Sequence, residues 1–468
     1  MPTPAVDTAA PAGNQATDSA ATLARRMTLI ATSLGFAVVQ LDISVVNVAI
    51  RSIGSALGGG VSSLQWVVSA YTVAFAAFIL TAGAVGDRVG ARRVFIAGFA
   101  LFTVASVVCG LAPSLGLLVG ARAVQGVGAA ILVPGSLSLL NHTYPEPAAR
   151  ARAVGLYLAG ASLSLSGGPL VGGVLIASLG WRAIFFINVP VAAVGVYLTR
   201  RYASETTRSA DRGLDLPGQI AAAVTLVALV AATIEGGHSG FGDPVVLAGF
   251  AAAALAGAAF VAIEARAPSP MLPLGLFRSR AFSGCTVIGL LVNICFYGMI
   301  FVFSLLFQRE QHLSPLQTGL ALAPIMVAIT GANLVAGRVL GRLGPRLTIT
   351  IGSALAGCGC AALLGVGAST PYLAMIVQIS LLGFGCGLIV PVITSEMLGS
   401  VDRSRSGVAS GTLNTMRQAG SAIGVALFGS LIAASLVAGL HAALAISVGL
   451  VIAIAALTRV LDRRVPQP

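Results

Sequence analysis

Residues 83–93 of this chain read GAVGDRVGARR, and 254 residues later residues 337–346 read GRVLGRLGPR. Both stretches follow a long apolar run and share the pattern Gly-x-x-x-x-Arg-x-Gly-x-Arg. Two further patterns recur in the same order, at offsets of 257 and 253 residues: Gly126-x-Gly128 with Pro134 as Gly383-x-Gly385 with Pro391, and Arg150-x-Arg152 as Arg403-x-Arg405. Three matches at nearly one offset predict two copies of one structural unit.

The composition places these two units in a lipid bilayer. Charged residues make up 9% of the 468 residues, hydrophobic residues make up 57%, and the mean hydropathy is +0.95. A soluble protein has about 25% charged residues, so this chain has too little polar surface to cover a water-soluble particle. At about 30 residues for each span with its loop, the length predicts roughly 14 to 16 membrane spans.

The apolar runs fall into groups of six, two and six, which predicts an all-α polytopic membrane protein of fourteen spans. Residues 25–199 and 281–461 form two six-helix bundles, and residues 200–280 hold cytoplasmic linkers with two accessory transmembrane helices. Residues 1–24 and 462–468 are cytoplasmic tails, the first predicted to be disordered because it lacks periodicity. Two parallel bundles imply a pseudo-twofold axis along the membrane normal and a binding site between the halves.

The basic residues orient the chain in the membrane. All 27 are Arg, and with a cytoplasmic N-terminus 22 of them fall in cytoplasmic loops or tails, while only Arg51, Arg182 and Arg309 face outward. Because Arg accumulates on the cytoplasmic side, the sequence predicts a multi-pass protein with both termini in the cytoplasm. The same distribution accounts for the net charge of +12 without a nucleic-acid partner.

Two charged residues of the first bundle lie inside spans, where an unpaired charge is costly and indicates function. Burial disfavours the ionised form of Asp42 and a nearby cation favours it, so Asp42 is a candidate proton carrier. The alternative is a packing role, with Asp42 bonded to Asn47 or to the backbone. Arg122 must meet a carboxylate or the substrate, unless it extends to the outer interface.

The turn between the second and third predicted spans contains a candidate conformational latch. Gly90 permits a tight turn. Asp87 can pair with Arg88 or Arg92, or meet a helix N-terminus, and so stabilise one closed face of the carrier. Membrane anchoring alone would account for the Arg residues but not for Asp87.

Several motifs together resemble the fourteen-helix drug:proton antiporters of the major facilitator superfamily, over residues 25–464. They are LDISVVNVA at residues 41–49, Gln65-Trp66 with Tyr71, the 83–93 stretch, Arg122-x-x-Gln125-Gly126-x-Gly128, the antiporter motif Gly155 with Gly168-Pro169-x-x-Gly172-Gly173, and Trp181-Arg182-x-x-Phe185-x-x-Asn188-x-Pro190. Ser164 stands where the antiporter motif usually has Gly. Ser is small enough to preserve close helix packing.

The resemblance implies that Arg122 takes part in proton transfer with Asp42. It also implies a substrate cavity between helices one, four, nine and twelve, for which the candidate residues are Gln40, Asn47, Gln125, Asn293, Phe296, Tyr297 and Gln378. Aromatic and amide groups suit amphipathic molecules. Arg417 lies in helix thirteen, which we expect at the periphery of the cavity, so structural and functional roles stay open for it. Glu396 is expected to pair with charges of the adjoining loop.

The sequence therefore predicts a proton-coupled antiporter of the bacterial cytoplasmic membrane, a monomer that exports small amphipathic drugs, antibiotics or related metabolites by alternating access. No metal or cofactor is expected, since the proton gradient drives transport and the His residues are scattered. The alternative is an importer or uniporter of a small metabolite from the same superfamily. An enzyme is not expected, because no paired carboxylates or nucleophile with a base lie within one leaflet. With Asp42 as the one deep carboxylate, monocations or neutral amphiphiles should be preferred over dications.

Labelling tests the topology. A Cys introduced at Ser239, between the accessory helices, should react with a membrane-impermeant thiol reagent added outside the cell. A Cys at Ser209, in the preceding loop, should react only after permeabilisation. The unmodified protein, with its six native Cys residues, gives the background. The reverse pattern would overturn the orientation.

Overall fold

The computed structural model describes residues 12–206, 215–268, 270–367, 370–401, 406–433 and 435–461, and it is helical almost throughout these ranges, with no strand among them. The first half comprises α1 (Ala12–Leu57), α2 (Val61–Val89), α3 (Ala91–Leu111), α4 (Leu115–Thr143), α5 (Pro147–Leu179), α6 (Ala183–Phe186) and α7 (Asn188–Tyr202). The rest comprises α8 (Leu216–Ser239), α9 (Pro244–Glu264), α10 (Arg280–Leu305), α11 (Pro315–Ala362), α12 (Ile376–Gly399), α13 (Ser406–Leu431) and α14 (Leu436–Leu461), with short helical turns η1 (Leu274–Arg278), η2 (Leu306–Glu310), η3 (Leu363–Gly365) and η4 (Tyr372–Ala374).

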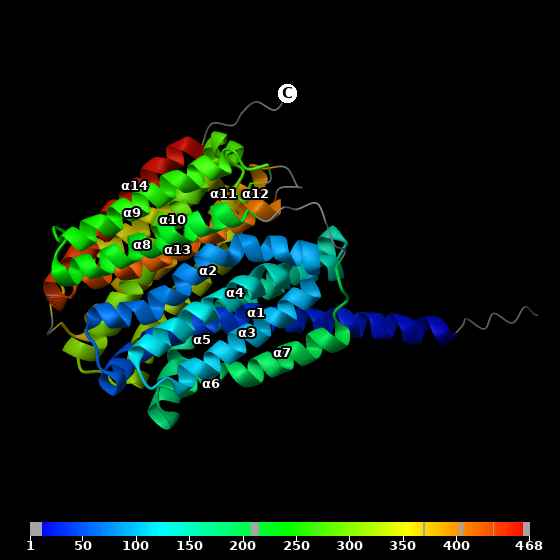
Figure 1. The fold of residues 1–468 in the computed structure, drawn as a ribbon, viewed down its shortest axis with the longest axis horizontal. Helices are drawn as coiled ribbons and strands as arrows, with labels where there is room; N and C mark the ends of the chain where they lie inside the picture. The colour runs from blue at the N-terminus through cyan, green and yellow to red at the C-terminus, as the bar shows by residue number, and fades with distance from the viewer. Residues whose placement is uncertain are drawn as a thin grey trace, which may run out of the picture.

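Helices of the two halves gather into two neighbouring groups, α1 to α7 and α10 to α14 (Figure 1). In the first group α1 packs on α5 and α7, and α4 packs on α2 and α3. In the second group α10 packs on α13 and α14, and α12 packs on α11. Across the boundary α2 contacts α13, α5 contacts α11, and α1 contacts α10. The contacts of α1 with α5 and α7 therefore correspond to those of α10 with α13 and α14. Likewise, the contacts of α4 with α2 and α3 correspond to those of α12 with α11. The residue bounds of the two bundles stay a prediction.

Glycines at repeated positions allow this packing in both halves. Each lies where an added Cβ would collide with a neighbouring helix: Gly126 against Tyr71 and Gly383 against Ile325, Gly128 against Phe102 and Gly385 against Ala356. In each of these two equivalent contacts, the contacted residues are 254 positions apart. Only small residues let helix backbones approach so closely. The short sequence repeat thus marks equivalent helix contacts in space.

The repeated turn is also equivalent in the two halves. Gly90, between α2 and α3, has a φ of 109°, and Gly344, inside α11, has a φ of 74°. Positive φ values of this size favour glycine over residues with a Cβ. Because Gly344 is not helical, α11 consists of two helices that meet at this turn.

The accessory helices lie at the edge of the boundary between the halves. α8 packs on α2 from the first half and on α13 from the second, and α9 packs on α8. Thr81 of α2 is joined to Gln219 of α8 by a hydrogen bond, and Gln219 Nε2 donates to the Ala77 carbonyl at 2.7 Å. Figure 1 shows α8 and α9 beside α13.

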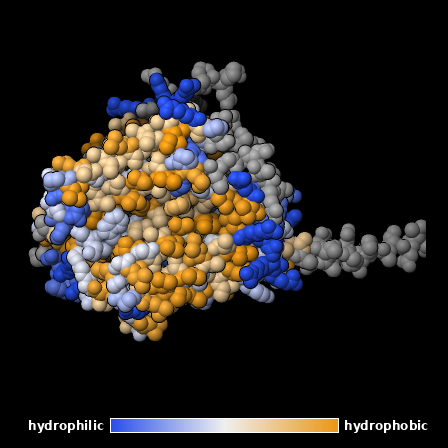
Figure 2. Space-filling view, viewed as in Figure 1, coloured by the Kyte–Doolittle hydropathy of each residue, from blue (hydrophilic) through white to orange (hydrophobic). Residues whose placement is uncertain are grey.

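The surface is that of a multi-pass membrane protein. Twelve helical segments of the described residues are long and apolar enough to cross a bilayer, the α11 segment among them as one. Exposed apolar side chains such as Leu163, 71% exposed, and Leu255, 72% exposed, lie on the outside. Figure 2 shows hydrophobic residues across the middle of one face and hydrophilic residues toward its margins. The count of fourteen spans, which further requires α13 and both parts of α11, stays a prediction.

The beginning of α1 differs from the expectation. We expected residues 1–24 to be disordered, but α1 begins at Ala12, and it projects beyond the bundle in Figure 1. For residues 12–24 the expectation of disorder was wrong, because Ala-rich sequence has high helix propensity and extends an existing helix without a new nucleus. Residues 1–11 and the tail at 462–468 lie outside the described residues.

The turn glycine Gly90 differs from Gly86, in the last turn of α2, in a testable way. Gly90→Ala should lower the free energy of unfolding by roughly 1–3 kcal/mol, because a Cβ requires strain at this φ and would lie 2.5 Å from Glu205 Oε1. Gly86→Ala is the control, since no atom lies within 4 Å of its Cβ position. Thermal unfolding in detergent measures both. Equal midpoints for the two variants would contradict the role of the turn.

Candidate functional site

A buried ion pair lies inside the first bundle. Arg122 Nη1 of α4 contacts Asp42 Oδ2 of α1, and 1% of each side chain is exposed. Arg122 therefore does not extend to the membrane interface. Asp42 does not bond to Asn47, whose side chain donates to the Ile43 carbonyl at 2.9 Å. The structure thus brings together the two charges that the sequence singled out separately.

Neutral side chains surround this pair with hydrogen bonds. Gln125 Nε2 donates to Asp42 Oδ1 at 2.9 Å, and Asn188 Nδ2 donates to the same oxygen at 3.1 Å. The same two amides donate to Ser106 Oγ, at 2.7 Å and 3.2 Å. Arg122 Nη1 also donates to Gln125 Oε1 at 2.6 Å. Hydrogen bonds to both charged groups offset the cost of removing them from water.

The guanidinium is also held by α2 and by aromatic rings. Arg122 Nε donates to the Val67 carbonyl at 3.0 Å. Its Cζ lies 4.3 Å from the ring centre of Tyr71 and 5.8 Å from that of Phe185. Five long helices, α1, α2, α3, α4 and α7, therefore contribute to one buried polar cluster. Any change of charge in this cluster acts on all five helices at once.

Sequence reasoning missed two members of this cluster, Asn188 and Ser106. Asn188 belonged to a quoted motif, but nothing in the sequence linked it to Asp42, 146 positions away. Ser106 lies in an apolar run and gave no signal. The spacing of Arg122 and Gln125 did predict a shared helix face.

The ion pair also bears on the expected substrate charge. We expected Asp42, as the one deep carboxylate, to favour monocations or neutral amphiphiles over dications. Arg122 already neutralises that carboxylate, so Asp42 gives no preference for cations while the pair is intact.

The antiporter-motif residues lie where α5 meets two other helices. An added Cβ at Gly168 would meet Ser44 of α1, and one at Gly172 would lie 3.1 Å from Val45 Cγ1. Gly173 faces the start of α11, 2.8 Å from Leu316 Cα. The Pro169 carbonyl lies against Gly319 of α11. At Gly155 no atom lies within 4 Å, so that position carries no such contact.

The predicted latch contains a carboxylate that sequence reasoning missed. Glu205 Oε1 accepts from Arg92 N at 2.9 Å at the start of α3, and Glu205 Oε2 lies 3.7 Å from Arg93 Nε. A carboxylate at this position is favoured by the helix dipole. Arg92 Nη2 donates to the Arg200 carbonyl at 2.7 Å, whereas Arg88 is exposed. Asp87 lies in the last turn of α2 and has an interaction of its own.

The predicted cavity residues lie in different parts of the structure. Gln125 belongs to the Asp42 cluster. Phe296 and Tyr297 stack edge to face at 5.2 Å on α10, and Asn293 donates to the Gly289 carbonyl at 2.8 Å on the same helix. Two partly exposed residues, Gln40 of α1 and Gln378 of α12, lie elsewhere. The Gln378 carbonyl lies 2.5 Å from the Cβ position of Gly359 in α11. Membership of one cavity stays a prediction for these residues.

Comparison with known proteins decides the family. The profile described as Major Facilitator Superfamily matches residues 32–425. The chain belongs to the Major Facilitator Superfamily. This facilitator is 36% identical over 404 residues to the "Methylenomycin A resistance protein" of Streptomyces coelicolor, covering 86% of this chain and 84% of the relative. It is 36% identical over 415 residues to the "Multidrug resistance protein Stp" of Mycobacterium tuberculosis, covering 89% and 77%.

Solved structures share the fold of this facilitator at low sequence identity. The nucleoside transporter NupG superposes with a TM-score of 0.66 at 10% identity, over 93% of this chain and 100% of that one. A bacterial homologue of the human lysosomal transporter Spinster gives a TM-score of 0.65 at 16% identity, over 95% and 99%. These likenesses concern the fold alone. The family is one of membrane transporters, so the protein is a multi-pass transporter.

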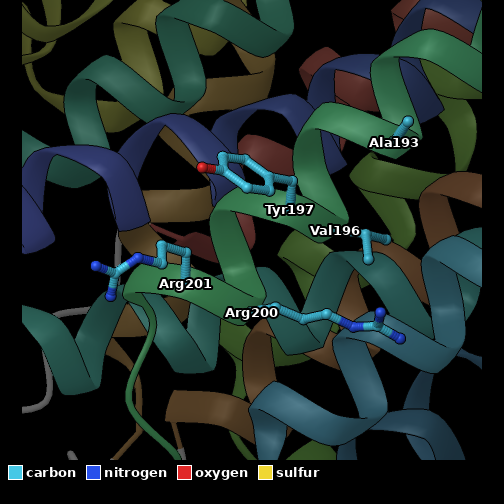
Figure 3. A pocket seen from close by; sticks show the side chains of 5 residues that line it. All are labelled: Ala193, Val196, Tyr197, Arg200 and Arg201. Carbon is cyan, nitrogen blue, oxygen red and sulfur yellow. The ribbon is translucent and has the colours of Figure 1, made fainter.

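A hollow on the surface of this facilitator is separate from the buried cluster. Its volume is about 410 Å³, and it is lined by residues of α7 alone: Ala193, Val196, Tyr197, Arg200 and Arg201. Figure 3 shows the two Arg side chains pointing apart. Tyr197 is 62% exposed on the outside of the bundle, so this hollow is not the predicted substrate cavity.

The buried ion pair predicts an unequal response to single and double substitutions. Arg122→Gln should destabilise the protein by about 3–5 kcal/mol, because it leaves an uncompensated carboxylate. The double variant Asp42→Asn with Arg122→Gln should recover most of this loss, since both charges are then absent. Thermal unfolding in detergent gives both values. Additive losses in the double variant would show that the two side chains do not interact.

Proposed function

We propose that this transporter exports small amphipathic drugs, antibiotics or related metabolites in exchange for protons, across the cytoplasmic membrane of a bacterium. The relatives support the substrate class: besides the two named above, one 32% identical over 412 residues is the "Tetracenomycin C resistance and export protein" of Streptomyces glaucescens. The observation that carries the proton coupling is the buried Asp42–Arg122 pair.

The pair offers a physical route from protonation to conformational change. As an ion pair it is neutral overall. Arg keeps its charge at all physiological pH values, so a proton on Asp42 removes the counter-charge and leaves a buried cation. Breaking a buried pair in this way costs roughly 3–5 kcal/mol. Protonation therefore favours a rearrangement of the five helices that hold the cluster, and loss of the proton restores the present packing.

The alternation also requires contacts between halves that can break. Near the ends of α1 and α10 that lie away from the Arg-rich loops, Ser304 Oγ donates to the Asn47 carbonyl and Arg51 donates to the Gln308 carbonyl. Beside them Gln65 of α2 donates to the Val425 and Ala426 carbonyls of α13 at 3.0 Å and 2.7 Å. These bonds close that face. Under the predicted topology it is the outer face, where exported substrate would leave after the bonds break.

Asp42→Asn tests the coupling. The substitution keeps the volume and the polar character of the side chain, but Asn cannot bind or release a proton. We expect a folded protein whose pH-gradient-driven efflux of a fluorescent amphiphile from proteoliposomes falls to the level of empty vesicles.

Asp243→Asn is the matched control. Asp243 caps α9, where its side chain accepts from Val245 N at 2.7 Å, and Asn is an equally good cap. Its efflux should equal that of the unmodified protein. Full gradient-driven efflux by Asp42→Asn would place the proton site elsewhere. Gradient-independent movement by the unmodified protein would support the uniporter alternative.

A further inference from the structure

Arg417 of α13 is a partly buried cation without a counter-charge among the described residues. Within the described part of the chain it makes no ion pair or hydrogen bond, and its Nε is buried without a partner. Its Cγ lies 3.6 Å from the Cβ position of Gly289 on α10, so the side chain runs against that helix. Arg417 differs in this respect from Arg122, the other Arg inside a span.

The second half offers no carboxylate to Arg417 among the residues described. Glu396 of α12 has an interaction of its own, and no ion pair joins Glu396 to Arg417. The titratable side chain near Arg417 is Tyr297, whose phenol is neutral at physiological pH. A guanidinium cannot shed its charge by losing a proton. An anion from outside the protein can balance it.

The position of Arg417 on α13 directs it between the halves. Leu413, Gly420 and Gly424 of this helix pack against α10, whereas Ala422 and Ala426 pack against α2 and α8. Between these two stripes runs a polar face at spacings of three and four residues: Asn414, Arg417, Gln418 and Ser421. Such spacing places side chains on one side of a helix. This polar face lies between α10 of one half and α2 of the other.

The neighbouring Tyr297 confirms that this region borders both halves. Tyr297 packs against one apolar cluster that joins both halves and against a second cluster that belongs to the first half. Tyr297 and Arg417 both keep partial exposure. α13 packs directly on α2 of the other half, so this helix lies at the boundary between the halves. Whether it is peripheral to the substrate cavity, as the sequence predicts, stays a prediction.

We propose that Arg417 binds the carboxylate of an amphipathic, singly anionic substrate in the space between the halves, with Asn414 and Gln418 as neutral hydrogen-bonding neighbours. This inference rests on the proposed function and names its substrate class. One uncompensated positive charge matches one negative charge. The adjoining aromatic side chains, Phe296 and Tyr297, suit the apolar part of such a molecule.

Equilibrium binding to the purified protein tests the site without a pH gradient. The probes are a diethylaminocoumarin carboxylic acid and its primary amide, which share one ring system and differ by one negative charge. The unmodified protein should bind the acid at least about tenfold more tightly than the amide, as expected for a charge-assisted hydrogen bond. Arg417→Gln should lose this difference and bind the amide unchanged.

Two further variants keep the test decisive. Arg417→Lys retains the charge but not the two-pronged geometry of the guanidinium. Its affinity for the acid should therefore lie between those of the unmodified protein and Arg417→Gln. Arg309→Gln removes an exposed Arg and should bind both probes as the unmodified protein does. Arg417→Gln should also unfold at or above the midpoint of the unmodified protein, because it removes an unpaired buried charge.

The outcomes separate this site from the proposed function. Equal affinity for acid and amide, absence of acid binding, or undiminished acid binding by Arg417→Gln would each overturn the inference. None of these results bears on proton-driven export, which is measured with proteoliposomes. Conversely, acid binding that depends on Arg417 without gradient-driven export would leave the site in place and overturn the proposed function.

Discussion

The buried pair of Asp42 and Arg122 is the constraint on which the first half depends. Neither charge can be buried alone at an acceptable free energy. Together they require donors and acceptors from several helices, which Gln125, Asn188 and the Val67 carbonyl supply. The glycines of α4 allow α2 and α3 to approach closely enough to provide them. Close helix packing in this bundle is therefore required for the ion pair to find its hydrogen-bonding partners.

The two halves share packing but not chemistry. The glycine contacts of α4 recur in α12, yet the positions equivalent to Arg122 and Gln125 hold Ile379 and Leu382, both fully buried. The second half therefore has no counterpart of the ion pair on α12. Its buried charge is Arg417, on α13. We propose that this asymmetry separates two tasks, with proton exchange in the first half and recognition of an anionic group in the second.

The boundary between the halves joins these two sites physically. The Tyr71 ring lies against Arg122, and Tyr297 packs against the apolar cluster that contains Tyr71. Tyr297 in turn is the ionisable neighbour of Arg417. Aromatic side chains therefore lie in the region between the two sites.

The sequence alone determined the membrane environment, the helical class, the repeat and the importance of Asp42 and Arg122, because composition, glycine spacing and the cost of charge in lipid act locally along the chain. Only the tertiary structure decided which charges meet. Asp42 and Arg122 are 80 positions apart, and Asn188 is 146 from Asp42. Such contacts depend on how helices are rotated and staggered, which no local pattern specifies. For the same reason nothing in the sequence pointed to Glu205 at the start of α3, or to Arg417 without an ion pair among the described residues.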